Sequence, residues 1–263
     1  MTLDRWTSGA DYDRWMGRWS RLLAHEFLKW LNVSPGLRWI DLCCGSGVLS
    51  EAIVEGCAPA IVVGTDASPQ QIEFARRQRA SENVTFEIAD AMSLPFADAT
   101  FDIAVCGLGL NYLPDPSRAL QKFQRLVRPG GTVAVYVWDY ERGARFVREF
   151  WDAAIAIDSH AAEFDQARRF PICTKPELSA LLERAGLKEP TTHALNIVTC
   201  FISFDDYWEP ILGGQGSAPA YLATLGPETQ ARIRDRLKST LPSDSTGAIE
   251  LPARAWAIRG QRP

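Results

Sequence analysis

The sequence has little histidine, no excess of positive charge and no long apolar run. Three histidines occur among 263 residues, and the formal net charge is −4. Duplex nucleic acid is bound by a basic protein face, so the acidic balance argues against nucleic acid as a partner. The first twenty residues carry charges and lack a long apolar stretch, so we expect no signal peptide. We also expect no membrane partner, because no segment is long and apolar enough to span a bilayer.

Cysteine is present, but not in a pattern typical of a metal site or a disulfide framework. Six cysteines occur, none spaced as Cys-x-x-Cys, and Cys43 and Cys44 are adjacent. We therefore expect no disulfides and no bound metal, and a reducing cytoplasm as the compartment. Apolar residues make up 46% of the chain, which is typical of a globular fold.

Short apolar runs alternate with segments of helical periodicity through residue 140. The runs predicted to be strands are 37–42, 60–66, 83–90, 101–107 and 132–138. Strands separated by helices in this way form a parallel sheet through right-handed crossovers. Two further extended runs, 192–202 and 247–258, flank a stretch of helical character. The prediction is an α/β fold with a seven-stranded, mostly parallel sheet and helices on both of its faces.

The chain shows no repeats and no polar linker, so we expect a single domain over residues 1–263. It would comprise an N-terminal helical cap (1–32), a ligand-binding core (33–140) and a C-terminal part (141–263). A helical insertion at 205–245, before the last strand, is predicted to act as a lid. The Gly-Gly-Gln-Gly run at 213–216 lacks the Lys-Ser/Thr of a phosphate-binding loop, so we interpret it as a flexible joint.

A glycine-containing turn follows the first predicted strand, and two ligand classes use such a turn. The run GSGVLS at 45–50 nearly matches the dinucleotide pattern GxGxxG, and Asp66 ends the second strand, where a ribose would be held. Asp41 stands just before the turn. A carboxylate there would repel a pyrophosphate and attract an ammonium group, directly or through water. The nucleoside with an ammonium group and no phosphate is S-adenosylmethionine.

Three further segments agree with this ligand: ADAM at 89–92, LPFADATFD at 94–102 and RLVRPGGTVAV at 125–135. With the glycine turn, they make the chain resemble the class I S-adenosylmethionine-dependent methyltransferases, nearest the small-molecule branch of type 11 and type 25. The resemblance covers roughly residues 10 to 140. It implies a Rossmann-like fold and transfer of a methyl group to an O, N or C atom of a small molecule. An NAD-dependent oxidoreductase and a non-catalytic S-adenosylmethionine-binding protein remain as alternatives.

The resemblance also implies a set of cofactor-binding residues. Asp41 would face the methionine amino group, Asp66 would accept both ribose hydroxyls, and Asp90 would accept the adenine amino group. The full set is Asp41, Cys43, Gly45, Gly47, Asp66, Ala67, Asp90, Ala91, Gly107 and Leu108. Family members usually have Gly or Ala where this chain has Cys43. We therefore expect no positive φ at Cys43 and interpret its thiol as a small filler.

Aromatic side chains near the carboxyl ends of the strands predict the acceptor site. The candidates are Tyr12, Trp15, Trp19, Tyr112, Trp138, Tyr140 and Trp208. A cavity lined by aromatic rings suits an aromatic or apolar small molecule and can stabilise a sulfonium through cation–π attraction. Aromatic residues are also common in a protein core. Methyl transfer depends mainly on alignment in a dry pocket. No histidine-centred pair is visible, so we assign no catalytic residue, and we expect a monomer or a homodimer.

Overall fold

The computed structural model describes residues 4, 9–79, 81–213 and 216–263, and it contains a seven-stranded sheet. The strands are β1 (Arg38–Leu42), β2 (Ile61–Asp66), β3 (Val84–Ile88), β4 (Phe101–Gly107), β5 (Val127–Trp138), β6 (Lys188–Phe201) and β7 (Ile249–Gln261). Their order is β3-β2-β1-β4-β5-β7-β6. Neighbours from β3 to β5 are parallel, and β7 runs antiparallel to both β5 and β6. The predicted mostly parallel sheet is confirmed.

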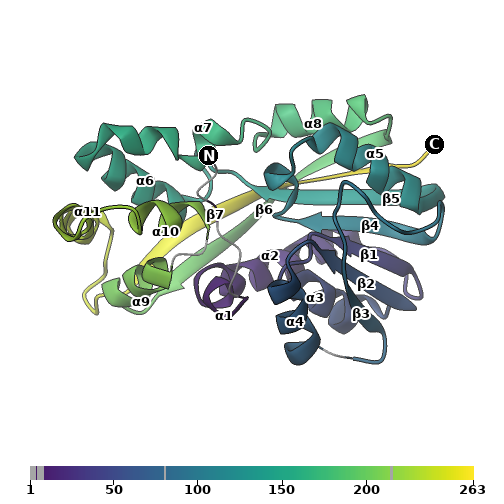
Figure 1. Cartoon of the computed structure of the whole chain (residues 1–263), viewed down its shortest axis with the longest axis horizontal. Helices are drawn as coiled ribbons and strands as arrows, with labels where there is room; N and C mark the ends of the chain where they lie inside the picture. The colour runs from purple at the N-terminus through teal and green to yellow at the C-terminus, as the bar shows by residue number, and fades with distance from the viewer. Residues whose placement is uncertain (1–3, 5–8, 80, 214–215) are drawn as a thin grey trace.

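Helices cover both faces of this sheet (Figure 1). One face carries α2 (Arg18–Leu31), α3 (Val48–Cys57) and α4 (Pro69–Gln78), and the other carries α5 (Pro116–Leu126) and α8 (Lys175–Arg184). Because the sheet is covered on both sides, its central strands β1, β2 and β4 are mostly apolar and mostly buried. Among the described residues, none of the helices is long and apolar enough to cross a membrane.

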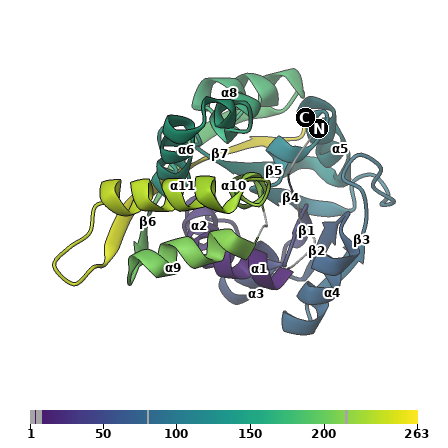
Figure 2. The ribbon, with the colours of Figure 1, turned by 60° about the vertical axis from the view of Figure 1, so that its left-hand side comes forward.

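Helical segments also gather at one end of the sheet. The chain enters through α1 (Gly9–Tyr12) and a π-helical turn, η1 (Asp13–Gly17), that continues into α2. The predicted insertion between β6 and β7 consists of α9 (Phe204–Trp208), η4 (Glu209–Gly213), α10 (Ser217–Leu222) and α11 (Pro227–Thr240). Figure 2 shows α10 and α11 lying between α6 (Arg145–Ile157) and α9. The proposed joint at 213–216 includes residues 214 and 215, which lie outside the described part of the chain.

Two helix starts fix the loops that follow β2 and β4. The Ser68 hydroxyl accepts a hydrogen bond from the Gln71 backbone N–H at 3.3 Å, and Pro69 is the first helical residue of α4. The Asp115 carboxylate does the same for α5 and accepts from the Arg118 N–H at 2.9 Å. Such caps satisfy donors that a helix start leaves open. They therefore hold the strand-to-helix turns at the carboxyl edge of the sheet.

Candidate cofactor site

A cavity of about 290 Å³ lies at the carboxyl ends of β1 to β4. In open α/β sheets, ligands bind at this edge, where the strand order reverses. Here the reversal falls between β1 and β4. Of the predicted cofactor residues, the cavity is lined by Asp41, Cys43, Gly45, Asp66, Ala67, Asp90, Ala91, Gly107 and Leu108.

The exception is Gly47, which does not line the cavity. Its φ is +81°, and a Cβ there would lie 2.9 Å from the ring of Phe86. Gly47 is therefore required by the backbone conformation and by packing beneath the turn. Gly45 also has a positive φ, +53°, but a Cβ there would meet nothing within 4 Å. The turn is thus open to a ligand at Gly45 and closed by Phe86 at Gly47.

Asp66 ties two loops together at the end of β2. One carboxylate oxygen accepts a hydrogen bond from the Gly45 N–H and the other from the Ser68 N–H, both at 2.9 Å. Burial raises the pKa of Asp66, and these two backbone bonds oppose the rise. Each carboxylate oxygen can accept a second hydrogen bond, which leaves capacity for a pair of ligand hydroxyls.

Asp41 is almost fully buried at the end of β1, with 1% exposure. Its Oδ2 accepts a hydrogen bond from the Ser50 hydroxyl at 2.7 Å, while its Oδ1 has no partner among the described residues. Burial raises the pKa of Asp41 to about 7, the Ser50 bond opposes this, and the charge of Asp66 adds to it. A buried carboxylate oxygen without a partner is costly, so the site fits a cationic ligand group.

Asp90 and Ala91 form the rim of the cavity beyond β3. The Asp90 side chain is exposed and accepts a hydrogen bond from the Met92 N–H at 2.8 Å, whereas Ala91 is buried. This turn presents an open carboxylate oxygen next to a small side chain. A heterocycle would find an acceptor and a flat apolar contact here.

The prediction for the backbone at Cys43 is wrong, because its φ is +56°. The chain must turn sharply there, since the next residue, Cys44, donates its N–H to the Thr65 carbonyl at 2.9 Å. A hydrogen bond with Cys106, together with burial, raises the pKa of the Cys43 thiol well above its usual value. Because the thiolate is the reactive form of cysteine, a raised pKa makes this thiol unreactive. Cys43 therefore serves as a small packing residue, in a left-handed backbone conformation that usually favours glycine.

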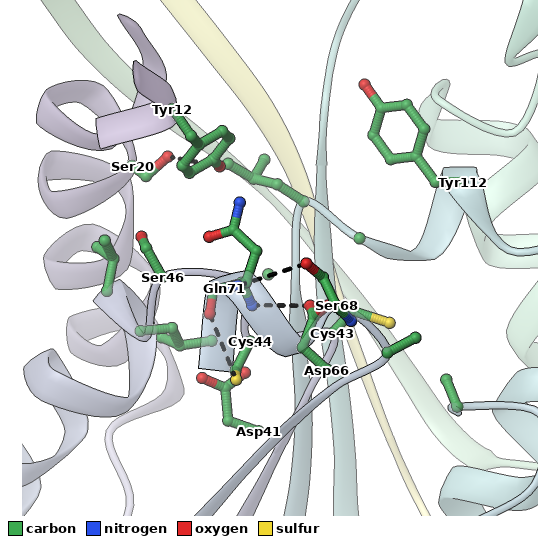
Figure 3. Close-up of a pocket in the computed structure, with 18 of the residues that line it drawn as sticks. Tyr12, Ser20, Asp41, Cys43, Cys44, Ser46, Asp66, Ser68, Gln71 and Tyr112 are labelled. Carbon is green, nitrogen blue, oxygen red and sulfur yellow. Dashed lines mark hydrogen bonds between the residues drawn. The ribbon is translucent and has the colours of Figure 1, made fainter. Parts of the chain in front are cut away.

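Two of the predicted acceptor-site residues line the cavity, Tyr12 and Tyr112. Figure 3 shows Tyr12 beside Ser20, with Tyr112 across from them and Asp41 at the lower side of the view. The Tyr112 hydroxyl is held by the Tyr140 hydroxyl at 3.3 Å. Trp15 borders a separate small cavity of about 20 Å³, which Tyr112 also lines.

The remaining candidates, Trp19, Trp138, Tyr140 and Trp208, line neither cavity and are buried in the core. Trp138 packs edge-on against Phe146 with ring centroids 5.3 Å apart, and Trp19 packs against Phe201 at 5.1 Å. These aromatic clusters join α2 and α6 to the sheet. The structure therefore corrects the acceptor-site prediction for these four residues, whose rings are taken up by core packing.

Five further polar residues line the cavity and were not among the predicted site residues: Ser20, Ser46, Ser68, Gln71 and Tyr136. Gln71 follows Ser68 at the spacing of a capping partner, and the sequence favoured that interpretation over a cofactor contact. Its side chain is buried, and its Oε1 has no partner within the described ranges. In the apolar run 132–138, Tyr136 and Thr132 are the residues with a hydroxyl group, and Thr132 stands at the start of the run. The hydroxyl inside the run was the signal that could have pointed to Tyr136.

Comparisons with known proteins agree with this geometry. A family model described as a methyltransferase domain matches residues 40–135. Demethylmenaquinone methyltransferase of Staphylococcus aureus strain JH9 is 32% identical over 171 residues, which cover 60% of this chain and 71% of the relative.

Two solved structures share the fold at low sequence identity. A provisionally named methyltransferase of Bacillus halodurans C-125 has a TM-score of 0.61 at 15% identity, covering 91% of this chain and 98% of the other. Phosphoethanolamine N-methyltransferase 2 of Haemonchus contortus, solved with phosphomonomethylethanolamine and S-adenosylhomocysteine, has a TM-score of 0.60 at 16% identity. That match covers 97% of this chain and 57% of the other.

The strand order and the cavity at its reversal define an α/β protein with a ligand-sized cavity at the carboxyl edge of the sheet. The chain belongs to the class I S-adenosylmethionine-dependent methyltransferase family. It is accordingly an S-adenosylmethionine-dependent methyltransferase, and its family implies S-adenosylmethionine as the cofactor.

Proposed function

We propose that the cavity at the ends of β1 to β4 holds S-adenosylmethionine and that Asp41 receives the ammonium group. The observation that carries this proposal is the buried Oδ1 of Asp41, which has no partner among the described residues. A cofactor ammonium would pair with this oxygen and keep the carboxyl group ionised. The Gly45 turn leaves space for the methionine portion beside it.

The nucleoside half would lie toward β2 and β3. Asp66 has acceptor capacity for the two ribose hydroxyls, because each of its oxygens uses one hydrogen bond for a backbone N–H. Asp90 and the Ala91 N–H would serve the adenine ring, and Ala67 would border it. Gln71 adds a buried carbonyl oxygen without a partner in the described structure, which a donor of the nucleoside would satisfy.

The charge of the cavity wall favours this cofactor over NAD. Its described lining residues include three carboxylates, those of Asp41, Asp66 and Asp90, and no Lys, Arg or His. A pyrophosphate at this wall would face like charges without a cationic partner. A sulfonium and an ammonium, by contrast, are attracted to it.

We also propose that the methyl acceptor is a small, uncharged molecule with an apolar or aromatic body. We place the acceptor beside Tyr12, Tyr112 and Leu113, which line the cavity. Burial raises the pKa of both phenols above the usual value, so they stay protonated and cannot accept a proton near neutral pH. This favours an acceptor atom that needs no base, such as an activated ring carbon or a neutral amine. The name of the Staphylococcus aureus relative specifies a demethylmenaquinone acceptor, which agrees with a flat apolar substrate.

When bound, the cofactor supplies an electrophilic methyl group, and the protein's task is alignment and exclusion of water. Tyr12 and Tyr112 would flank the transfer path and offer π faces to the sulfonium. We further propose a cytoplasmic location, which rests on the absence of a Cys-x-x-Cys or disulfide pattern in the sequence.

Calorimetric titration of the protein with S-adenosylhomocysteine and, separately, with NADH tests the cofactor. We expect binding of the first and none of the second, and the reverse result would overturn the proposal. The acceptor is tested by following S-adenosylhomocysteine production with 1,4-dihydroxynaphthalene and with phosphoethanolamine. A preference for phosphoethanolamine would contradict an uncharged acceptor.

A further inference from the structure

Tyr136 occupies a special position opposite the end of β4. It pairs with Gly107 in the β4–β5 register, and its carbonyl accepts a hydrogen bond from the Leu108 N–H at 2.8 Å. Its ring packs against Phe27 of α2 with centroids 4.7 Å apart. A Cβ on Gly107 would lie 2.6 Å from the Tyr136 hydroxyl oxygen. The hydroxyl therefore sits directly over Gly107, in space that only glycine leaves open.

This hydroxyl borders the cavity and has no partner among the described residues. Tyr136 is 2% exposed and belongs to the cavity lining. Throughout the described ranges, its hydroxyl makes no hydrogen bond with another residue. Buried polar groups in proteins are nearly always hydrogen-bonded. A buried hydroxyl that faces a cavity without a protein partner thus points to a ligand atom.

The charges around Tyr136 identify the kind of ligand atom. The cofactor's amino acid end carries an ammonium and a carboxylate on the same carbon atom. If the ammonium pairs with Asp41, the carboxylate lies close by and needs a hydrogen-bond donor. The described lining offers no cationic side chain for it. Burial is the main cause that raises the pKa of the Tyr136 phenol, and the negative charge of Asp41 raises it further. Tyr136 therefore lies close to Asp41.

We propose that the Tyr136 hydroxyl donates a hydrogen bond to the carboxylate of the cofactor's amino acid end. The assignment rests on the proposed placement of S-adenosylmethionine. Because burial and the Asp41 charge raise the pKa of Tyr136 well above its usual value, the phenol keeps its proton and remains a donor across the physiological pH range. Gly107 contributes by leaving room for the hydroxyl. A neutral donor replaces the cation that a carboxylate usually pairs with.

The test compares two ligands that differ by the carboxylate alone. Calorimetry measures the affinity of the wild-type protein and of Tyr136→Phe for S-adenosylmethionine and for decarboxylated S-adenosylmethionine. Loss of a hydrogen bond to a charged group weakens binding by about ten- to a hundredfold. We expect a loss of this order for S-adenosylmethionine and an unchanged affinity, within about twofold, for the decarboxylated ligand.

The matched control is Tyr207→Phe. Tyr207 is equally buried, but its hydroxyl donates to the Phe146 carbonyl at 2.8 Å, and it does not line the cavity. The affinities for S-adenosylmethionine and for its decarboxylated form should both be unchanged in Tyr207→Phe. If Tyr136→Phe does not fold, Gly107→Ala displaces the hydroxyl instead, and its loss should again be larger for S-adenosylmethionine than for the decarboxylated ligand.

Equal losses for the two ligands, or no loss for either, would overturn the carboxylate contact and leave the proposed cofactor site in place. Failure of the wild-type protein to bind S-adenosylmethionine would overturn the proposed placement and the Tyr136 contact together. The two failures are therefore distinguishable in the same set of titrations.

Discussion

At the scale of single residues, the Asp66 carboxylate holds two backbone N–H groups and is also the ribose acceptor that we propose. Replacing it with alanine removes acceptors for the Gly45 and Ser68 N–H groups as well as for the ribose. We expect Asp66→Ala to weaken S-adenosylhomocysteine binding by roughly 1.5–3 kcal/mol, about ten- to a hundredfold. The exposed Asp244→Ala is the control. Unchanged affinity of Asp66→Ala in calorimetry would disprove the ribose assignment.

Asp41 makes the stability of the free protein depend on pH. Its pKa is about 7 in the folded protein against a usual value of 3.8, chiefly because it is buried. Between these values, the folded state binds a proton that the unfolded state does not. The contribution of Asp41 to the free energy of unfolding is therefore full below this range, falls as pH rises through it, and levels off above about 7.

The cofactor ammonium should reverse this preference, because it stabilises the ionised carboxylate. We expect the affinity for S-adenosylhomocysteine to rise with pH up to about 7 and binding below that pH to release a proton. Asp41→Asn should remove most of the pH dependence of the free energy of unfolding, measured by urea unfolding. It should also remove most of the pH dependence of the affinity and the proton release, measured by calorimetry in two buffers. If the pH dependence persists in Asp41→Asn, it belongs to another group, such as Asp66, whose pKa is also raised by burial.

At the scale of elements, the β1–α3 turn accommodates a cysteine in a left-handed conformation. The φ of +56° disfavours Cys43 relative to glycine, while its side chain fills space against Gly109, where a Cβ would lie 2.5 Å from Cys43 Cβ. Relief of backbone strain and loss of packing oppose each other in Cys43→Gly. We expect a stability change within about 1 kcal/mol and nearly unchanged S-adenosylhomocysteine affinity. A tenfold or larger loss of affinity would show that the thiol has a binding role.

Aromatic residues of the α1–η1 segment and of α9 were both predicted to form the acceptor site, but only the first segment reaches the main cavity, through Tyr12. Trp15 and Tyr207 pack edge-on with centroids 6.1 Å apart, which places α9 behind η1. We expect hydrogen exchange at residues 12–17 to slow when S-adenosylhomocysteine binds, and exchange at 204–208 to change little. Equal slowing in both segments would instead indicate closure of the whole helical end.

At the scale of the whole molecule, the strands and the three acids of the site were predictable because each follows from local sequence. The apolar runs mark the strands, and Asp41, Asp66 and Asp90 each stand where such a run ends. Tyr136 was not predictable, although Trp138 was proposed two residues away. Both side chains lie on the same face of β5, and the β4–β5 register alone decides which one meets Gly107 and the cavity. Register is a tertiary property that no local pattern encodes.

The insertion between β6 and β7 leaves the sheet and returns to it at neighbouring positions, since Phe201 pairs with Ile249. Its two ends are therefore held together by the strand pair, whatever chain lies between them. Between these ends the insertion is not a free loop, because buried residues such as Tyr207 and Tyr221 pack against Trp15 and Trp151 of the remaining core. None of the described residues of the insertion lines the main cavity. Its helices therefore support the α6 side of the molecule and leave the wall of the cavity to the strand ends and the α1–α2 region.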